Sequence, residues 1–149
     1  MQRPEETAVK GGKKKGDEKI PKVAKSKILV IDDDPIFRQL LNEFLTLHGY
    51  NVTLADNGYS GLDIILKDYT LNLIILDLLM PGINGIETMR QIKVLRKDLP
   101  IIITSGFLDY HFPDGTDSLK SMADLVLEKP FSLDELYQAC KKLLPEQKP

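Results

Sequence analysis

The chain has 149 residues, a net charge of −2, an apolar fraction of 42% and a charged fraction of 28%. These values are ordinary for one globular domain with a substantial core. No apolar stretch is long enough to span a membrane, and no apolar segment follows the N-terminal lysines, so we expect a cytoplasmic protein. The single cysteine, Cys140, excludes an intramolecular disulfide and a cysteine zinc cluster, and is expected in the core.

Charge divides the chain near Ser26. Up to Lys27 there are nine basic and four acidic residues, whereas the remainder has eleven basic and eighteen acidic ones. Residues 1–25 hold few large apolar side chains, so they cannot offset the entropy lost by ordering their backbone. We expect a basic, disordered arm, which is either an electrostatic handle for nucleic acid, anionic lipid or an acidic partner, or only a solubilising leader; we favour the leader.

Residues 26–149 form the predicted domain, in which strand and helix patterns alternate. The expected strands are 28–31, 51–55, 73–77, 101–104 and 125–127. Apolar residues with helical spacing lie between them and include Leu40, Leu66, Tyr69 and Leu95. Segment 107–117 is predicted to be a loop and 118–123 a short helix. Repeated strand–helix units predict an α/β fold, a doubly wound sheet of five parallel strands with about five helices on its two faces.

Polar residues mark the carboxyl ends of four of these strands. Asp32 and Asp33 follow the first strand, Asp77 ends the third, Ser105 follows the fourth and Lys129 follows the fifth. In a doubly wound sheet these ends meet at one edge, where ligands bind. Taken singly, each aspartate is also an ordinary turn or cap residue. Taken together, three carboxylates would raise one another's pKa unless cations neutralise them.

A hard divalent ion and Lys129 are the natural cations for this edge. Mg2+ accepts carboxylates, a carbonyl and waters as ligands, and it readily bridges a phosphoryl oxygen. An aspartate can act as the nucleophile and form an aspartyl phosphate. Ser105 and Lys129 can then contact the phosphoryl oxygens as charge develops. The set of residues is typical of phosphoryl transfer.

Four segments carry these residues in a specific order and spacing: ILVIDDDP at 28–35, LDLLMPGINGIE at 76–87, IIITSG at 101–106 and LEKPFSLDEL at 127–136. Through them, residues 28–148 resemble the receiver domain of two-component response regulators. The resemblance implies the flavodoxin-like receiver fold and a signalling protein rather than an enzyme with an external substrate. It also implies phosphorylation by a histidine kinase or histidine phosphotransferase with Mg2+, followed by binding to a downstream protein or by phosphorelay transfer.

The resemblance also assigns roles to individual residues. It implies that Asp77 is the phosphoacceptor, that Asp33 binds Mg2+ directly, that Asp32 binds it through water, and that the backbone carbonyl of Leu79 is a further ligand. Arg38 lies five residues after Asp33, the usual offset in the family, so this pair of aspartates fits better than the next pair along the chain.

The remaining aspartate, Asp34, is then expected to cap a helix. Ser105 lies five residues after Pro100 and is preferred over Thr104 as the switch hydroxyl. Lys129 is expected to bind the phosphoryl group and to precede a cis proline, as in the family.

Three departures from the common receiver pattern limit the comparison. The position of the aromatic switch holds Val126, so a smaller rearrangement would have to carry the signal. The positions two after Asp77 and two after Ser105 hold Leu79 and Phe107, and we hypothesise that they shield the phosphoryl group from water. The loop at 107–117 is also about two residues longer than usual, and is either a partner surface or only a longer loop.

Two other classes of function are weighed against this interpretation. A degenerate receiver would act as a constitutive protein-binding module, but the five polar residues described above are all in place. A hydrolase with an aspartate nucleophile would need a general acid nearby, and Leu79 stands where that acid belongs. The chain ends five residues after Leu144, so no output domain is expected. No nucleic-acid partner is expected either, except through the basic arm.

Overall fold

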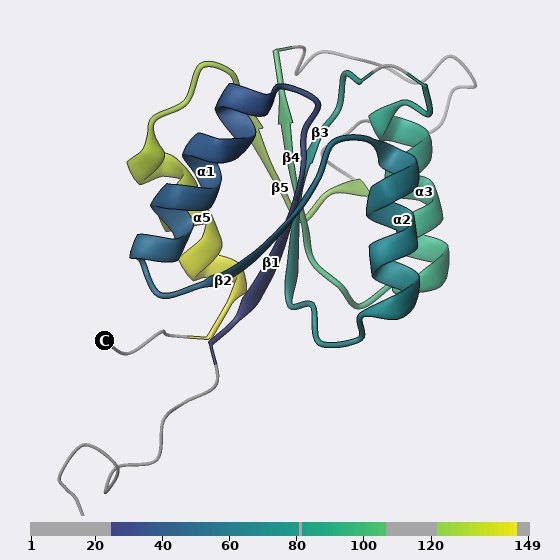
Figure 1. Ribbon diagram of the computed structural model, residues 1–149, viewed down its shortest axis with the longest axis horizontal. Coiled ribbons are helices and arrows are strands. Elements are labelled where there is room, and N and C mark those ends of the chain that lie inside the picture. Colours follow the sequence, from purple (N-terminus) through teal and green to yellow (C-terminus); the bar gives the residue numbers. More distant parts are fainter. Residues whose placement is uncertain (1–24, 81, 107–121, 146–149) are drawn as a thin grey trace, which may run out of the picture.

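The structure, a computed structural model, describes residues 25–80, 82–106 and 122–145. Its five strands form one parallel sheet with the order β2-β1-β3-β4-β5 (Figure 1). The strands are β1 Lys27–Ile31, β2 Asn51–Ala55, β3 Leu73–Asp77, β4 Ile101–Ser105 and β5 Leu125–Glu128. The helices are α1 Pro35–Leu47, α2 Gly58–Lys67, α3 Gly85–Leu95 and α5 Leu133–Leu143. Helices α1 and α5 cover one face and α2 and α3 the other, which confirms the predicted doubly wound fold.

Several predictions lie outside the described residues. These are the disorder of the basic arm, apart from Lys25, the loop at 107–117 and most of the short helix at 118–123. None of the helices that the structure does describe is long and apolar enough to cross a membrane.

The core has two halves, one on each face of the sheet. Successive side chains of a strand point to opposite faces, so Ile28 and Val30 pack beneath α1 and α5 whereas Leu29 and Ile31 pack beneath α2 and α3. All five residues of β3 are buried. Burial on both faces explains why the strand sequences show no polar alternation. Cys140 is fully buried on the α1/α5 side, as predicted.

A short polar side chain caps the N-terminus of each described helix. The capping residues are Asp34, Asn57, Asn84 and Ser132, each of which accepts a backbone N–H from the first turn. Ser132 and Glu135 form a complete capping box with bonds of 3.0 and 2.8 Å. The predicted role of Asp34 as a helix cap is confirmed. The caps make each helix begin a few residues beyond the carboxyl end of the preceding strand.

Three residues that were predicted on buried helix faces are exposed. Leu66 of α2 is 51% exposed, whereas the adjacent Ile65 is buried in the core. Leu40 is 44% exposed and Leu95 is 43% exposed. In α1 the adjacent Leu41 occupies the core side instead. In α3 the buried residues Met89 and Ile92 are three positions apart, and each step of three falls about 60° short of a full helical turn. A second such step therefore carries Leu95 to the edge of the buried face.

Tyr69 was also assigned to a helix face, and this was wrong because α2 ends at Lys67. The carboxylate of Asp68 accepts both the N–H and the hydroxyl of Thr70, at 2.9 and 2.5 Å. Such a local turn competes with continued helix. Tyr69 consequently lies at the surface, where it is 73% exposed and stacks against the guanidinium of Arg96 at 5.0 Å from the ring centroid.

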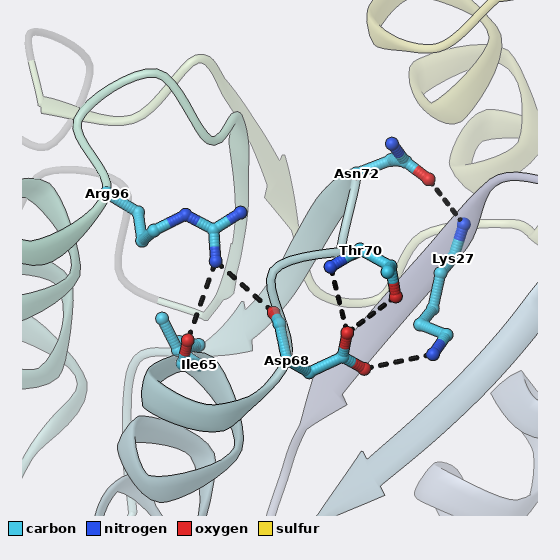
Figure 2. A network of polar contacts seen from close by, with 6 residues as sticks. All are labelled: Lys27, Ile65, Asp68, Thr70, Asn72 and Arg96. Carbon is cyan, nitrogen blue, oxygen red and sulfur yellow. Dashed lines mark hydrogen bonds and ion pairs between the residues drawn. The ribbon is translucent and has the colours of Figure 1, made fainter.

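Asp68 is also the centre of a polar network at the amino edge of the sheet (Figure 2). Its carboxylate lies 2.9 Å from Lys27 Nζ, while the backbone N–H of Lys27 donates to Asn72. Arg96 donates to the carbonyl oxygens of Asp68 and Ile65. The network joins the start of β1 to the ends of α2 and α3. The hydrogen bonds from Thr70 and the ammonium of Lys27 lower the pKa of Asp68 to about 2.

We expect Asp68→Asn to lower the free energy of unfolding by about 1 kcal/mol at pH 6, because it removes the half-buried ion pair with Lys27, whose attraction is partly screened by water. Because the folded-state pKa lies below the ordinary 3.8, the stabilisation is present above about pH 4 and is lost as the pH falls towards 2. Urea denaturation at pH 6 and at pH 3 measures the difference. Asp63→Asn, which breaks a more exposed pair with Lys67, is the control and should change little. An equal loss at both pH values would contradict the assignment.

Candidate functional site

Three aspartates meet at the carboxyl edge of the sheet. Ile31 of β1 is in register with Leu76 of β3, so the next residues, Asp32 and Asp77, lie side by side. With Asp33 they form a cluster whose ligand oxygens all lie within 4.8 Å of one another. The structure therefore brings together the three carboxylates that the strand ends predict.

Burial makes this cluster electrostatically costly. Asp32 is 2% exposed and Asp77 is 6% exposed, while Asp33 is exposed to solvent. Loss of hydration raises the pKa of both Asp32 and Asp77. The negative charge of the neighbouring Asp32 carboxylate raises the pKa of Asp77 further. A set of three convergent carboxylates, two of them poorly hydrated, fits a hard divalent cation such as Mg2+.

Lys129 supplies a positive charge from the end of β5. Its Nζ lies 3.6 Å from Asp32 Oδ2 and 3.6 Å from Asp77 Oδ1. Its backbone N–H donates to the carbonyl of Ser105 at 2.8 Å, which holds the end of β5 against the end of β4. The peptide between Lys129 and Pro130 is cis, as the resemblance implies. The predicted lysine is thus placed between the two buried carboxylates.

Backbone contacts hold Asp32 in position from α1. Arg38 donates from Nη1 to the carbonyl oxygen of Asp32 at 2.6 Å, and the N–H of Asp34 donates to Asp32 Oδ1 at 2.9 Å. The Asp34 carboxylate is itself turned to the N–H groups of Ile36 and Phe37. Asp34 therefore caps α1 and lies outside the carboxylate cluster, in agreement with the sequence-based choice.

Burial does not separate the two candidate switch hydroxyls, since Ser105 and Thr104 are each 1% exposed. Thr104 is in register with Asp77, and its Oγ1 has no hydrogen-bond partner within the part of the chain that the structure describes. The preference for Ser105 stays a prediction. The closeness of Thr104 to Asp77 depends on strand register, for which the sequence carries no direct signal.

Leu79 lies at the rim of the site. Its N–H donates to Asp77 Oδ1 at 3.3 Å and its side chain is 53% exposed. The role of its carbonyl as a metal ligand stays a prediction. Val126 is half-buried against the α2/α3 half of the core, and Phe107 lies outside the described residues.

Comparison with known proteins identifies this arrangement. A family model described as the response regulator receiver domain matches residues 28–141. The chain belongs to the response regulator receiver family. It is 35% identical to sporulation initiation phosphotransferase F of Bacillus subtilis (strain 168), over 80% of this chain and 94% of that protein. It is 37% identical to response regulator MprA of Mycobacterium tuberculosis (strain H37Rv) over 83% of this chain and 52% of MprA, so it spans about half of that relative.

Solved receiver structures share the fold. Response regulator TrrA of Thermotoga maritima, in complex with Mg(2+)-BeF, is similar with a TM-score of 0.68 and 38% identity, over 80% of this chain and 99% of TrrA. The chemotaxis protein CheY4 of Vibrio cholerae is similar with a TM-score of 0.70 and 27% identity, over 81% of this chain and all of CheY4. The receiver fold and a place in two-component signalling are therefore established for this chain.

Proposed function

We propose that this receiver is phosphorylated on Asp77 by a histidine kinase or a histidine phosphotransferase in the presence of Mg2+. The phosphorylated form then binds a separate downstream protein or passes its phosphoryl group on in a phosphorelay. The observation that carries the proposal is the buried Asp77 carboxylate, 3.6 Å from the Lys129 ammonium and clustered with two further carboxylates.

In the transfer step an Asp77 carboxylate oxygen forms a bond to the phosphorus of the donor. The bond between phosphorus and the donor's imidazole nitrogen breaks, and its electron pair stays on that nitrogen. Lys129 approaches the transferred oxygens as their charge develops, and Ser105 donates a hydrogen bond to one of them. Burial of Asp77 keeps competing water away from the reacting atoms.

Asp32, Asp33, Asp77 and the carbonyl of Leu79 would hold Mg2+ in this site. When bound, the ion neutralises negative charge on the phosphoryl oxygens. The TrrA complex with Mg(2+)-BeF supports this part of the proposal, because it places Mg2+ in a relative of 38% identity. The name and the 94% coverage of sporulation initiation phosphotransferase F support the phosphorelay variant and action on separate proteins.

The direct test is intact mass spectrometry of the protein incubated with acetyl phosphate. We expect a gain of one phosphoryl group with Mg2+ and none with a chelator. Transfer of that group to a histidine phosphotransferase, and back, would identify a relay. A folded protein that binds Mg2+ but gains no phosphoryl group would instead be a constitutive binding module or a receiver that is phosphorylated only by its kinase.

We expect Leu79→Asn to shorten the lifetime of the phosphorylated form by about tenfold, which corresponds to about 1.4 kcal/mol in the barrier to hydrolysis. The reason is that a polar side chain at the rim admits the attacking water that Leu79 excludes. The measurement is the decay of the phosphorylated mass after the donor is removed. Val94→Asn on α3, also an exposed apolar residue, is the control. An unchanged or longer lifetime in Leu79→Asn would overturn the shielding hypothesis.

A further inference from the structure

The two carboxylates do not by themselves fix the Lys129 ammonium. Its distance of 3.6 Å to Asp32 and to Asp77 exceeds the about 2.8 Å of a charged hydrogen bond. The Lys129 side chain is also 33% exposed, and a flexible four-carbon stem leaves the ammonium many positions. A further contact is needed to keep it near the place where the phosphoryl group arrives.

The ring of Phe37 makes such a contact. Lys129 Nζ lies over this ring at 4.9 Å from its centroid, inside the about 6 Å range of cation–π attraction. Phe37 belongs to α1, immediately before the Arg38 that holds the backbone of Asp32. Helical spacing alone places Phe37 on the apolar face of α1, so the sequence gives no sign that this residue belongs to the site.

Phe131 holds the Phe37 ring in turn. The two rings meet edge to face, with centroids 5.8 Å apart and planes at 76°. Both residues are half-buried and pack against the α1/α5 half of the core. The contacts form a continuous path from the loop before α5, through Phe131 and Phe37, to the Lys129 ammonium and the two buried carboxylates.

We propose that Phe37 is a positioning residue for phosphoryl transfer, whose ring holds the Lys129 ammonium beside Asp32 and Asp77 while Phe131 holds the ring. The inference rests on the proposed function and assigns it a residue that touches neither donor nor metal. Attraction to a ring face has little angular preference, so the ammonium can move towards the incoming phosphoryl oxygens without losing the ring. A direct hydrogen bond to a carboxylate would have to be broken first.

The first test compares the rates of phosphoryl gain from acetyl phosphate with Mg2+. Phe37→Leu should lower the maximal rate about fivefold, with little change in the donor concentration at half-maximal rate, while Phe37→Tyr, which keeps a ring face, should restore it. Phe44→Leu is the matched control, on the same helix and the same face two turns later. Phe44 is half-buried against His48 and Tyr137 and is remote from Lys129. Equal rates in Phe37→Leu and Phe44→Leu would overturn the proposal.

A double-variant cycle separates the cation–π contact from general packing. In a Lys129→Met background, where no ammonium remains, Phe37→Leu should produce no further loss of rate. A full fivefold loss in that background would mean that Phe37 acts through the fold rather than through Lys129.

A second measurement does not depend on phosphorylation. The ε-methylene protons of Lys129 should show an upfield ring-current shift in NMR spectra, lost in Phe37→Leu and retained in Phe44→Leu. Absence of the shift in the wild type would overturn the inference whatever the rates. If the wild type shows the shift but gains a phosphoryl group neither from acetyl phosphate nor from a phosphorylated histidine kinase or phosphotransferase, the proposed function fails, and with it the positioning role, while the contact itself stands.

Discussion

Asp77→Asn should lower phosphoryl uptake from acetyl phosphate by about a thousandfold or more, the scale of loss when a nucleophile is removed. An amide oxygen is a poor nucleophile. The other buried carboxylate beside Lys129, that of Asp32, is proposed to hold Mg2+ and is not expected to take over the role of Asp77. Intact mass with Mg2+ and acetyl phosphate measures the loss directly. The wild type run in parallel shows that the donor and the ion are competent.

The same replacement should leave the protein folded and more stable without Mg2+. Burial and the Asp32 carboxylate both raise the pKa of Asp77, which means that its charge is held at a cost in the folded state. Removing the charge should raise the free energy of unfolding at pH 7 in the presence of a chelator, as urea denaturation would measure. A more stable protein that takes up no phosphoryl group separates loss of chemistry from loss of fold.

Asp34→Asn is the matched control. Asp34 follows Asp33 in the sequence, but its side chain caps α1 instead of joining the carboxylate cluster. Asparagine caps a helix about as well as aspartate does. Uptake should therefore stay within about twofold of the wild type. A loss in Asp34→Asn as large as in Asp77→Asn would move Asp34 into the site and would contradict the choice of Asp32 and Asp33.

The sheet could be predicted because its strands are buried on both faces. The unbroken apolar run of β3 is favourable only in a strand that is buried between two layers of helices. The helix starts were equally accessible, because a cap such as Ser132 with Glu135 is a local interaction. The end of α2 could not be predicted in this way. The apolar helical pattern continues to Tyr69, but the hydrogen bonds from Thr70 to the Asp68 carboxylate form a turn that competes with the helix.

The edge that gathers the polar residues could also be predicted, because carboxyl ends of parallel strands meet. The contacts between individual side-chain atoms could not be predicted from the sequence. The position of Lys129 Nζ between two carboxylates and the Phe37 ring depends on side-chain rotamers and on the approach of α1 to the loop before α5. The burial of Thr104 beside Asp77 depends on the register of β3 and β4. A local sequence pattern determines neither the rotamer of a side chain nor the register between two strands.

The backbone around Asp77, at the end of β3, depends on a glycine. A Cβ on Gly85 would lie 2.5 Å from the Cα and the carbonyl oxygen of Leu78, and 2.7 Å from the carbonyl oxygen of Asp77. These are backbone atoms at the end of β3, so they cannot rotate away as a flexible side chain would. The N–H of Gly85 also donates to the Leu78 carbonyl at 2.9 Å. Any side chain must therefore push the start of α3 away from the Asp77 backbone.

We expect Gly85→Ala to lower the free energy of unfolding by about 3 kcal/mol, at the upper end of the cost of overpacking. The fraction that stays folded should also take up phosphoryl groups more slowly, because the displaced backbone moves Asp77 relative to Lys129. Urea denaturation measures the first effect, and phosphoryl uptake at low temperature measures the second. The two effects have one cause, so we expect them to appear together.

Gly106→Ala is the control for stability, since a Cβ there would meet no atom of the described residues within 4 Å. Its free energy of unfolding should stay within about 0.5 kcal/mol of the wild type. If Gly85→Ala were as stable as this control and still slow in uptake, the glycine would serve the geometry of Asp77 without serving the fold. If it were as stable and as fast, the close approach of α3 to Asp77 and Leu78 would have no part in holding the site.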